Sequence, residues 1–155
     1  MALLNDIEKF RQETGNAEAT FYCLQNITLV KNTNANCFHV VDGQQRLTTL
    51  LILLSFLQHE TDSTPLLLEN KLQYSIRPET HEFITKQVLT GHIWEQETVP
   101  ERKDQYYIRE VARSIQAWFK ENTATDKGKF LEILLSRVKL IVNVCLLYTS
   151  DAADD

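Results

Sequence analysis

The sequence predicts an α+β domain with a small mixed sheet followed by a mostly helical half. Two observations lead to this fold class. Segments rich in β-branched and aromatic residues lie at 21–41 and again at 140–144. Between them, apolar residues recur at helical spacing, most clearly over 104–121. The chain has 155 residues, of which 43% are hydrophobic and 24% charged, so we expect a single globular domain.

The first part of the chain predicts one helix and a hairpin. Residues 2–13 have an amphipathic pattern that ends at Gly15-Asn16. Residues 21–31 favour a strand, and the asparagine-rich stretch 32–36 favours a turn. Residues 37–41 favour a second strand, whose apolar run from Phe38 to Val41 predicts burial.

The remaining elements follow from periodicity. A leucine pattern at offsets of three, four, seven and ten predicts a helix that begins near Gln44 and runs to about Leu57. Alternation over 71–77 predicts a half-exposed strand. The other elements are helices over 78–89, 104–121 and 130–138, and a closing strand over 140–144.

The turn between the second strand and the leucine-rich helix carries a set of polar residues suited to phosphate chemistry. A helix N-terminus presents free N–H groups and a positive dipole end to an anion. Gly43 lets the backbone approach a ligand closely, and Arg46 offers a fork of donors for phosphate. Asp42 could hold Mg²⁺ or accept a proton from water, and Gln44 or Gln45 could orient that water.

A purely structural interpretation fits the same spacing. Asp42 followed three residues later by Gln45 matches a capping pattern, with Asp42 as the N-cap of the helix. Gly43 would then serve the turn, while Gln44 and Arg46 would be solvated. The motif has one glycine and no Gly-Lys-Ser/Thr, so it is not a Walker loop.

The string Asp42-Gly43-Gln44-Gln45-Arg46-Leu47-Thr48-Thr49-Leu50 resembles the signature of the GmrSD-type restriction endonuclease N-terminal domain family. Weaker similarity extends from the first helix to about Val144. The resemblance implies a ParB/sulfiredoxin-like fold and a motif that binds and hydrolyses a nucleotide. It assigns catalysis to Asp42, Gln44, Gln45 and Arg46, and nucleotide binding to Asp42, Gly43, Gln44 and Arg46.

The resemblance also implies a wider system. We expect a sensor domain of a modification-dependent, type IV-like anti-phage restriction system in a prokaryotic cytoplasm. Its cofactors would be GTP, UTP or ATP with Mg²⁺, the ion held by Asp42. Its partners would be an HNH-type nuclease domain, absent from this chain, and DNA contacted through the parent assembly. The alternative is a ParB-like module in which Arg46 and the helix terminus hold a DNA phosphate without turnover.

The two ends depart from the family pattern. No motif resembling Pro-x-Tyr-Gln-Arg-x-Tyr-x-Trp precedes Ala2, and no Phe-Glu-x-Leu-Asn-x-x-Gly follows Val144. We therefore expect residues 1–144 to be a partial domain, truncated at both ends, whose own turnover is in question. Residues 145–155 resemble a reading frame of a transposon-derived sequencing adapter, so we expect a non-native tail rather than a genuine acidic one.

Charge and cysteine content narrow the function classes. Formal net charge is −5, and three of these negative charges belong to the last five residues, which leaves −2 on 1–144. A nearly neutral domain lacks the excess of positive charge that non-specific DNA binding requires. Cys23, Cys37 and Cys145 form no C-x-x-C pair, which favours a reducing compartment. The leucine-rich helix is too short to span a bilayer, and we expect no membrane partner.

Overall fold

The computed structural model describes residues 1–15, 20–32, 36–95, 97 and 99–145. Its helices and strands, in chain order, are α1 (Ala2–Thr14), β1 (Tyr22–Asn32), β2 (Cys37–Asp42), α2 (Gln44–Glu60), α3 (Pro78–Phe83), the π-helix η1 (Ile84–Val88), α4 (His92–Glu95), α5 (Lys103–Glu121), α6 (Lys127–Ser136) and β3 (Val138–Cys145). This arrangement confirms the predicted α+β class.

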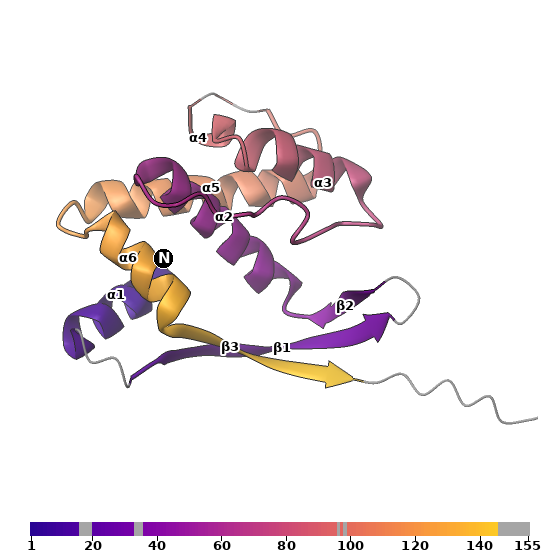
Figure 1. The fold of residues 1–155 in the computed structure, drawn as a ribbon. Helices are drawn as coiled ribbons and strands as arrows, with labels where there is room; N and C mark the ends of the chain where they lie inside the picture. Colours follow the sequence, from indigo (N-terminus) through magenta and orange to yellow (C-terminus); the bar gives the residue numbers. More distant parts are fainter. Residues whose placement is uncertain (16–19, 33–35, 96, 98, 146–155) are drawn as a thin grey trace, which may run out of the picture.

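The three strands form a mixed sheet in the order β2-β1-β3. β1 pairs with β2 in an antiparallel hairpin and with β3 in parallel. Figure 1 shows the helices gathered on one side of this sheet, with the β1–β2 hairpin extending beyond them. A parallel pair requires a long crossover, and here every helix after α1, from α2 to α6, lies between the hairpin and β3.

The core lies mainly between helices, with α2 at its centre. Leu51 to Leu53 and Ser55 to Leu57 of α2 are all buried, so this half of the helix is enclosed on every side. The cluster around it takes apolar side chains from α1, η1, α4, α5 and α6. The prediction that the motif helix is the heart of the domain is therefore confirmed.

Most predicted elements are present, but the burial of β2 was predicted wrongly. Phe38 is 51% exposed and Val41 is 61% exposed, and only Val40 is half-buried. The reason is tertiary: β2 is an edge strand in a part of the sheet that extends past the helices. Its β-forming residues signal pairing with β1 rather than enclosure.

The predicted strand over 71–77 is also wrong. This segment lies within the connection from α2 to α3 and consists of turns and irregular backbone. Leu72 and Tyr74 pack against the core, which explains part of the alternation, but Ile76 is 94% exposed. The Tyr74 hydroxyl is hydrogen-bonded to Thr48 of α2. Packing on a helix thus replaces pairing with a strand.

The helix predicted over 78–89 forms with a change of pitch. It begins at Pro78 as α3 and continues as the π-helix η1, which ends before Gly91 with its φ of +84°. The Ser55 hydroxyl of α2 donates to the Val88 carbonyl of η1, 2.9 Å away.

The predicted foreign tail, apart from Cys145 at the end of β3, lies outside the described residues.

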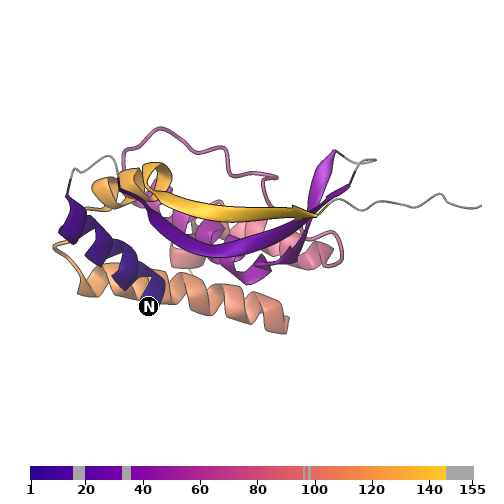
Figure 2. The same cartoon turned by 90° about the horizontal axis from the view of Figure 1, so that it is seen from below.

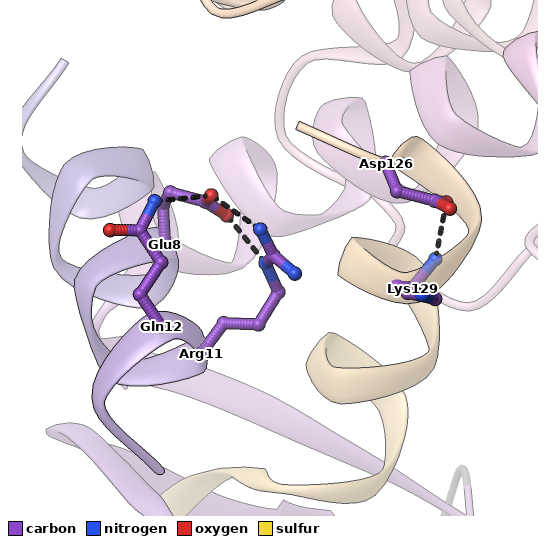
Figure 3. A network of polar contacts seen from close by, with 5 residues as sticks. All are labelled: Glu8, Arg11, Gln12, Asp126 and Lys129. Carbon is purple, nitrogen blue, oxygen red and sulfur yellow. Dashed lines mark hydrogen bonds and ion pairs between the residues drawn. The ribbon is translucent and has the colours of Figure 1, made fainter. Parts of the chain in front are cut away.

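Figure 3 shows two groups of polar contacts, one within α1 and one at the start of α6, and the charge of Asp126 acts on Arg11 between them. Glu8 is buried and accepts hydrogen bonds of 2.8 and 2.7 Å from Arg11 and one of 2.8 Å from Gln12. The Arg11 guanidinium holds the pKa of Glu8 below its ordinary value, against the opposing effect of burial. Asp126 caps α6 by accepting from the Lys129 N–H at 3.0 Å, and that bond lowers the Asp126 pKa.

Replacing Glu8 with glutamine tests this network through pH. Because the folded-state pKa is lowered, the stabilisation is fully present above the unfolded value near 4.3 and is lost as pH falls through the folded value. We expect Glu8→Gln to lower the free energy of unfolding by about 1–2 kcal/mol at pH 7. Its stability should also fall less steeply below about pH 4.5.

Urea unfolding followed by circular dichroism over a pH series measures both effects. Glu13→Gln is the matched control, because Glu13 lies on the same helix and has a 64% exposed side chain that pairs with the exposed Lys9. Equal pH profiles for Glu8→Gln and the unsubstituted protein would contradict the prediction.

Candidate functional site

The five residues Asp42 to Arg46 form the junction between β2 and α2. Asp42 ends β2 opposite Thr28, and α2 begins at Gln44. Gly43 between them is left-handed, with φ +93° and ψ 13°. A Cβ at Gly43 would lie 2.4 Å from Cγ2 of Ile27, so both the backbone angle and the space require glycine. This close approach fixes the start of α2 against β1.

The N-terminus of α2 has no side-chain cap. Its N-cap residue is Gly43, and the Leu47 N–H donates to the Gly43 carbonyl at 3.0 Å. The N–H groups of Gln44, Gln45 and Arg46 therefore precede the helical ladder, at the positive end of the dipole. The alternative in which Asp42 is the N-cap is wrong, because Asp42 belongs to β2.

Arg46 turns towards β1. Its Nη1 donates to the Asn26 carbonyl at 2.6 Å, and its Nη2 donates to Oε1 of Gln25 at 2.9 Å. The β1–β3 register shifts between Leu24 and Ile27, so Gln25 and Asn26 lie at a bulge. Arg46 therefore satisfies a carbonyl at an interruption of the ladder. A guanidinium has five N–H donors, and these two bonds leave capacity for an anion.

The amides and the carboxylate differ in their contacts. Gln44 Nε2 donates to the Val40 carbonyl at 3.0 Å, which bends its side chain back over β2. Asp42 and Gln45 are exposed. Among the described residues no ion pair joins Asp42 to Arg46. The structure thus brings the five residues to one turn, with Gln44 and Arg46 bound to the protein and Asp42 and Gln45 open to solvent.

The β1 residues at this junction were missed by the sequence analysis. Gln25 and Asn26 hold the Arg46 guanidinium, and Ile27 closes one side of Gly43. A signal was present: two successive polar residues interrupt the alternation of an otherwise apolar strand, which is typical of a bulge. No feature of the nearby sequence indicated that this bulge would bind Arg46, which is twenty positions after Asn26.

The turn offers one possible ligand for a metal ion bound together with a nucleotide. Mg²⁺ is commonly bound by one or two carboxylates together with substrate phosphates, and Asp42 supplies one exposed carboxylate beside the helix terminus. No group of three or more His, Cys, Asp or Glu side chains positioned to hold a metal occurs among the described residues.

The described residues also line surface clefts away from this turn, of which two are the best formed. One, of about 440 Å³, lies between Met1 and α5, and includes Tyr107 and Trp118. The second, of about 320 Å³, lies between the end of α2, the following loop and η1. Neither is lined by a residue of the motif. The candidate site is therefore defined by the helix terminus and its neighbours rather than by either cleft.

Comparison with known proteins identifies one family. The model of a family described as the N-terminal domain of the GmrSD restriction endonuclease matches residues 1–155, the whole chain. No curated protein and no solved structure matches the chain. The predicted ParB/sulfiredoxin-like architecture therefore stays a prediction, whereas the α+β class is observed.

In the described part of the chain no helix has the length and apolar character needed to cross a bilayer.

Proposed function

The chain belongs to the family of GmrSD restriction endonuclease N-terminal domains, and from that premise we propose that it is a nucleotide-binding, NTP-hydrolysing sensor of a restriction system. Family membership supports a restriction-system component. The hydrolytic role, the response to modified DNA and the control of a separate HNH-type nuclease are our proposal.

The uncapped start of α2 is the observation that carries this proposal. Three backbone N–H groups precede the helical ladder behind a left-handed glycine, and the Arg46 guanidinium lies beside them. A phosphate group placed there would meet the positive end of the dipole and the unused donors of Arg46.

The remaining motif residues would then take distinct roles. The Asp42 carboxylate would accept a proton from the attacking water or hold Mg²⁺, which neutralises developing phosphate charge when bound. Gln45 is exposed and would orient that water. Gln44 would contribute through its backbone N–H while its side chain stays on Val40, or would release that bond when the nucleotide binds.

We expect Asp42→Ala and Arg46→Ala each to lower hydrolysis of GTP, UTP or ATP by about 100-fold, since each removes a group that stabilises the transition state. Phosphate release with Mg²⁺ measures this, in the chain and in a longer version that carries the upstream motif predicted by the resemblance.

Gln25→Ala is the matched control for Arg46. It removes one structural partner of the guanidinium and leaves the guanidinium itself in place. If Arg46 binds phosphate, Gln25→Ala should hydrolyse nucleotide at close to the unsubstituted rate. An equal loss in Gln25→Ala and Arg46→Ala would assign Arg46 a purely structural role.

Two results would overturn the proposal. Normal hydrolysis in both Asp42→Ala and Arg46→Ala would remove the motif from the chemistry. No hydrolysis in the longer version, with DNA binding that depends on Arg46, would instead favour a ParB-like module that holds a DNA phosphate.

A further inference from the structure

β3 leaves one long side of the sheet open. It is the last strand in the order β2-β1-β3, and among the described residues no strand lies on its outer side. Figure 2 shows β3, in yellow, along this border. An edge strand presents a row of backbone N–H and C=O groups that another strand can pair with.

The backbone groups that point outward can be identified. The Tyr22 N–H donates to the Arg137 carbonyl at 2.9 Å, so the odd-numbered residues of β3 turn their backbone groups towards β1. The extra residue at the bulge between Leu24 and Ile27 lies on β1, so the alternation in β3 continues unbroken. The outward groups therefore belong to the even-numbered residues, Val138, Leu140, Val142 and Val144.

This edge lacks the features that normally discourage pairing. The strand Val138–Cys145 contains one charged residue, Lys139, and no proline. Three of its apolar side chains are exposed, with Ile141 at 52%, Val142 at 46% and Val144 at 48%. A strand of this kind gains both hydrogen bonds and apolar burial when a second strand is added.

The sequence of β3 identifies the second strand. Val138-Lys139-Leu140-Ile141-Val142-Asn143-Val144 has the same pattern of polar and apolar residues in both directions from Ile141. A two-fold axis through an antiparallel pair requires this self-complementarity, because each residue then faces its mirror position. We propose that β3 pairs with β3 of a second copy of this chain, antiparallel and centred on Ile141, to form a continuous six-stranded sheet.

The pairing register follows from the same pattern. Centred on Ile141, the interface places Lys139 opposite Asn143. At all the remaining positions of 138–144 an apolar residue lies opposite an apolar residue. The two lysines then lie about 14 Å apart, four residues along the strands. A centre at Leu140 would place Lys139 against Ile141, and a centre at Val142 would place Ile141 against Asn143.

Measurement of mass in solution tests the association. Light scattering after size exclusion over a concentration series should give twice the 18.0 kDa chain mass. Val142→Pro removes an outward N–H without touching the bonds to β1, so this variant should give 18.0 kDa with an unchanged circular dichroism spectrum. Val142→Thr keeps the N–H and should still dimerise. A monomeric unsubstituted chain, or a dimeric Val142→Pro variant, overturns the proposal.

Disulfide trapping tests the register. Cys23, Cys37 and Cys145 are all exposed and free, so they are first replaced by serine. In this background Ile141→Cys places two thiols in a non-hydrogen-bonded pair with Cα atoms about 4.5 Å apart, within disulfide reach. Asn143→Cys is the matched control, since its thiols would be about 14 Å apart. Oxidation should cross-link the first variant and not the second, and equal cross-linking contradicts the register.

Discussion

Gly43→Ala is expected to lower the free energy of unfolding by about 3 kcal/mol. Two physical effects add. A residue with a Cβ pays about 1–2 kcal/mol to adopt the left-handed backbone seen here. The new methyl group would also lie 2.4 Å from Cγ2 of Ile27, which is branched, 3% exposed and unable to move aside freely. The strain falls on the turn that connects β2 to the central helix.

Gly15→Ala shows a backbone cost without a clash. Gly15 ends α1 with φ +51° and ψ −129°, a different positive-φ conformation from that of Gly43, and a Cβ there would meet no atom of the described residues within 4 Å. We expect a backbone cost of about 1–3 kcal/mol. Urea unfolding followed by circular dichroism gives both values. A loss of under about 2 kcal/mol for Gly43→Ala, which the backbone cost alone would explain, would contradict the contact with Ile27.

Phe56→Ala is expected to cost about 3–5 kcal/mol. Phe56 is 2% exposed and stacks on Phe119 with ring centroids 5.4 Å apart. Trp94 of α4 contacts it edge-on, also at 5.4 Å. Removing the ring opens a cavity between α2, α4 and α5 and forfeits both aromatic contacts. Thermal unfolding should show a lower midpoint temperature.

Phe38→Ala is the matched control, because it deletes the same side chain from β2, where 51% of Phe38 is exposed. We expect a loss well under half that of Phe56→Ala, since less apolar area leaves water when Phe38 folds. Equal losses at the two positions would contradict the position of the core between the helices.

The candidate site divides into a part that sequence could predict and a part that it could not. The position of the turn, the glycine and the start of α2 were predicted, because each depends on neighbouring residues. The partners of Arg46 were not, because Gln25 and Asn26 reach it only when β1 folds beside α2. The sequence predicted a role for Gly43 in the turn, but not its contact with the Ile27 side chain, which also excludes a Cβ there.

The sequence by itself determined the longer helices, the hairpin and the junction at Gly43, since periodicity and turn chemistry act over a few residues. It did not predict the short helix α4 over His92–Glu95. Only the tertiary structure decided which faces are buried. Phe38 and Val41 carry apolar side chains yet lie exposed, because no helix covers that end of the sheet. The segment 71–77 alternates like a strand yet packs on α2. Burial and pairing depend on contacts between distant residues, and a local pattern does not contain them.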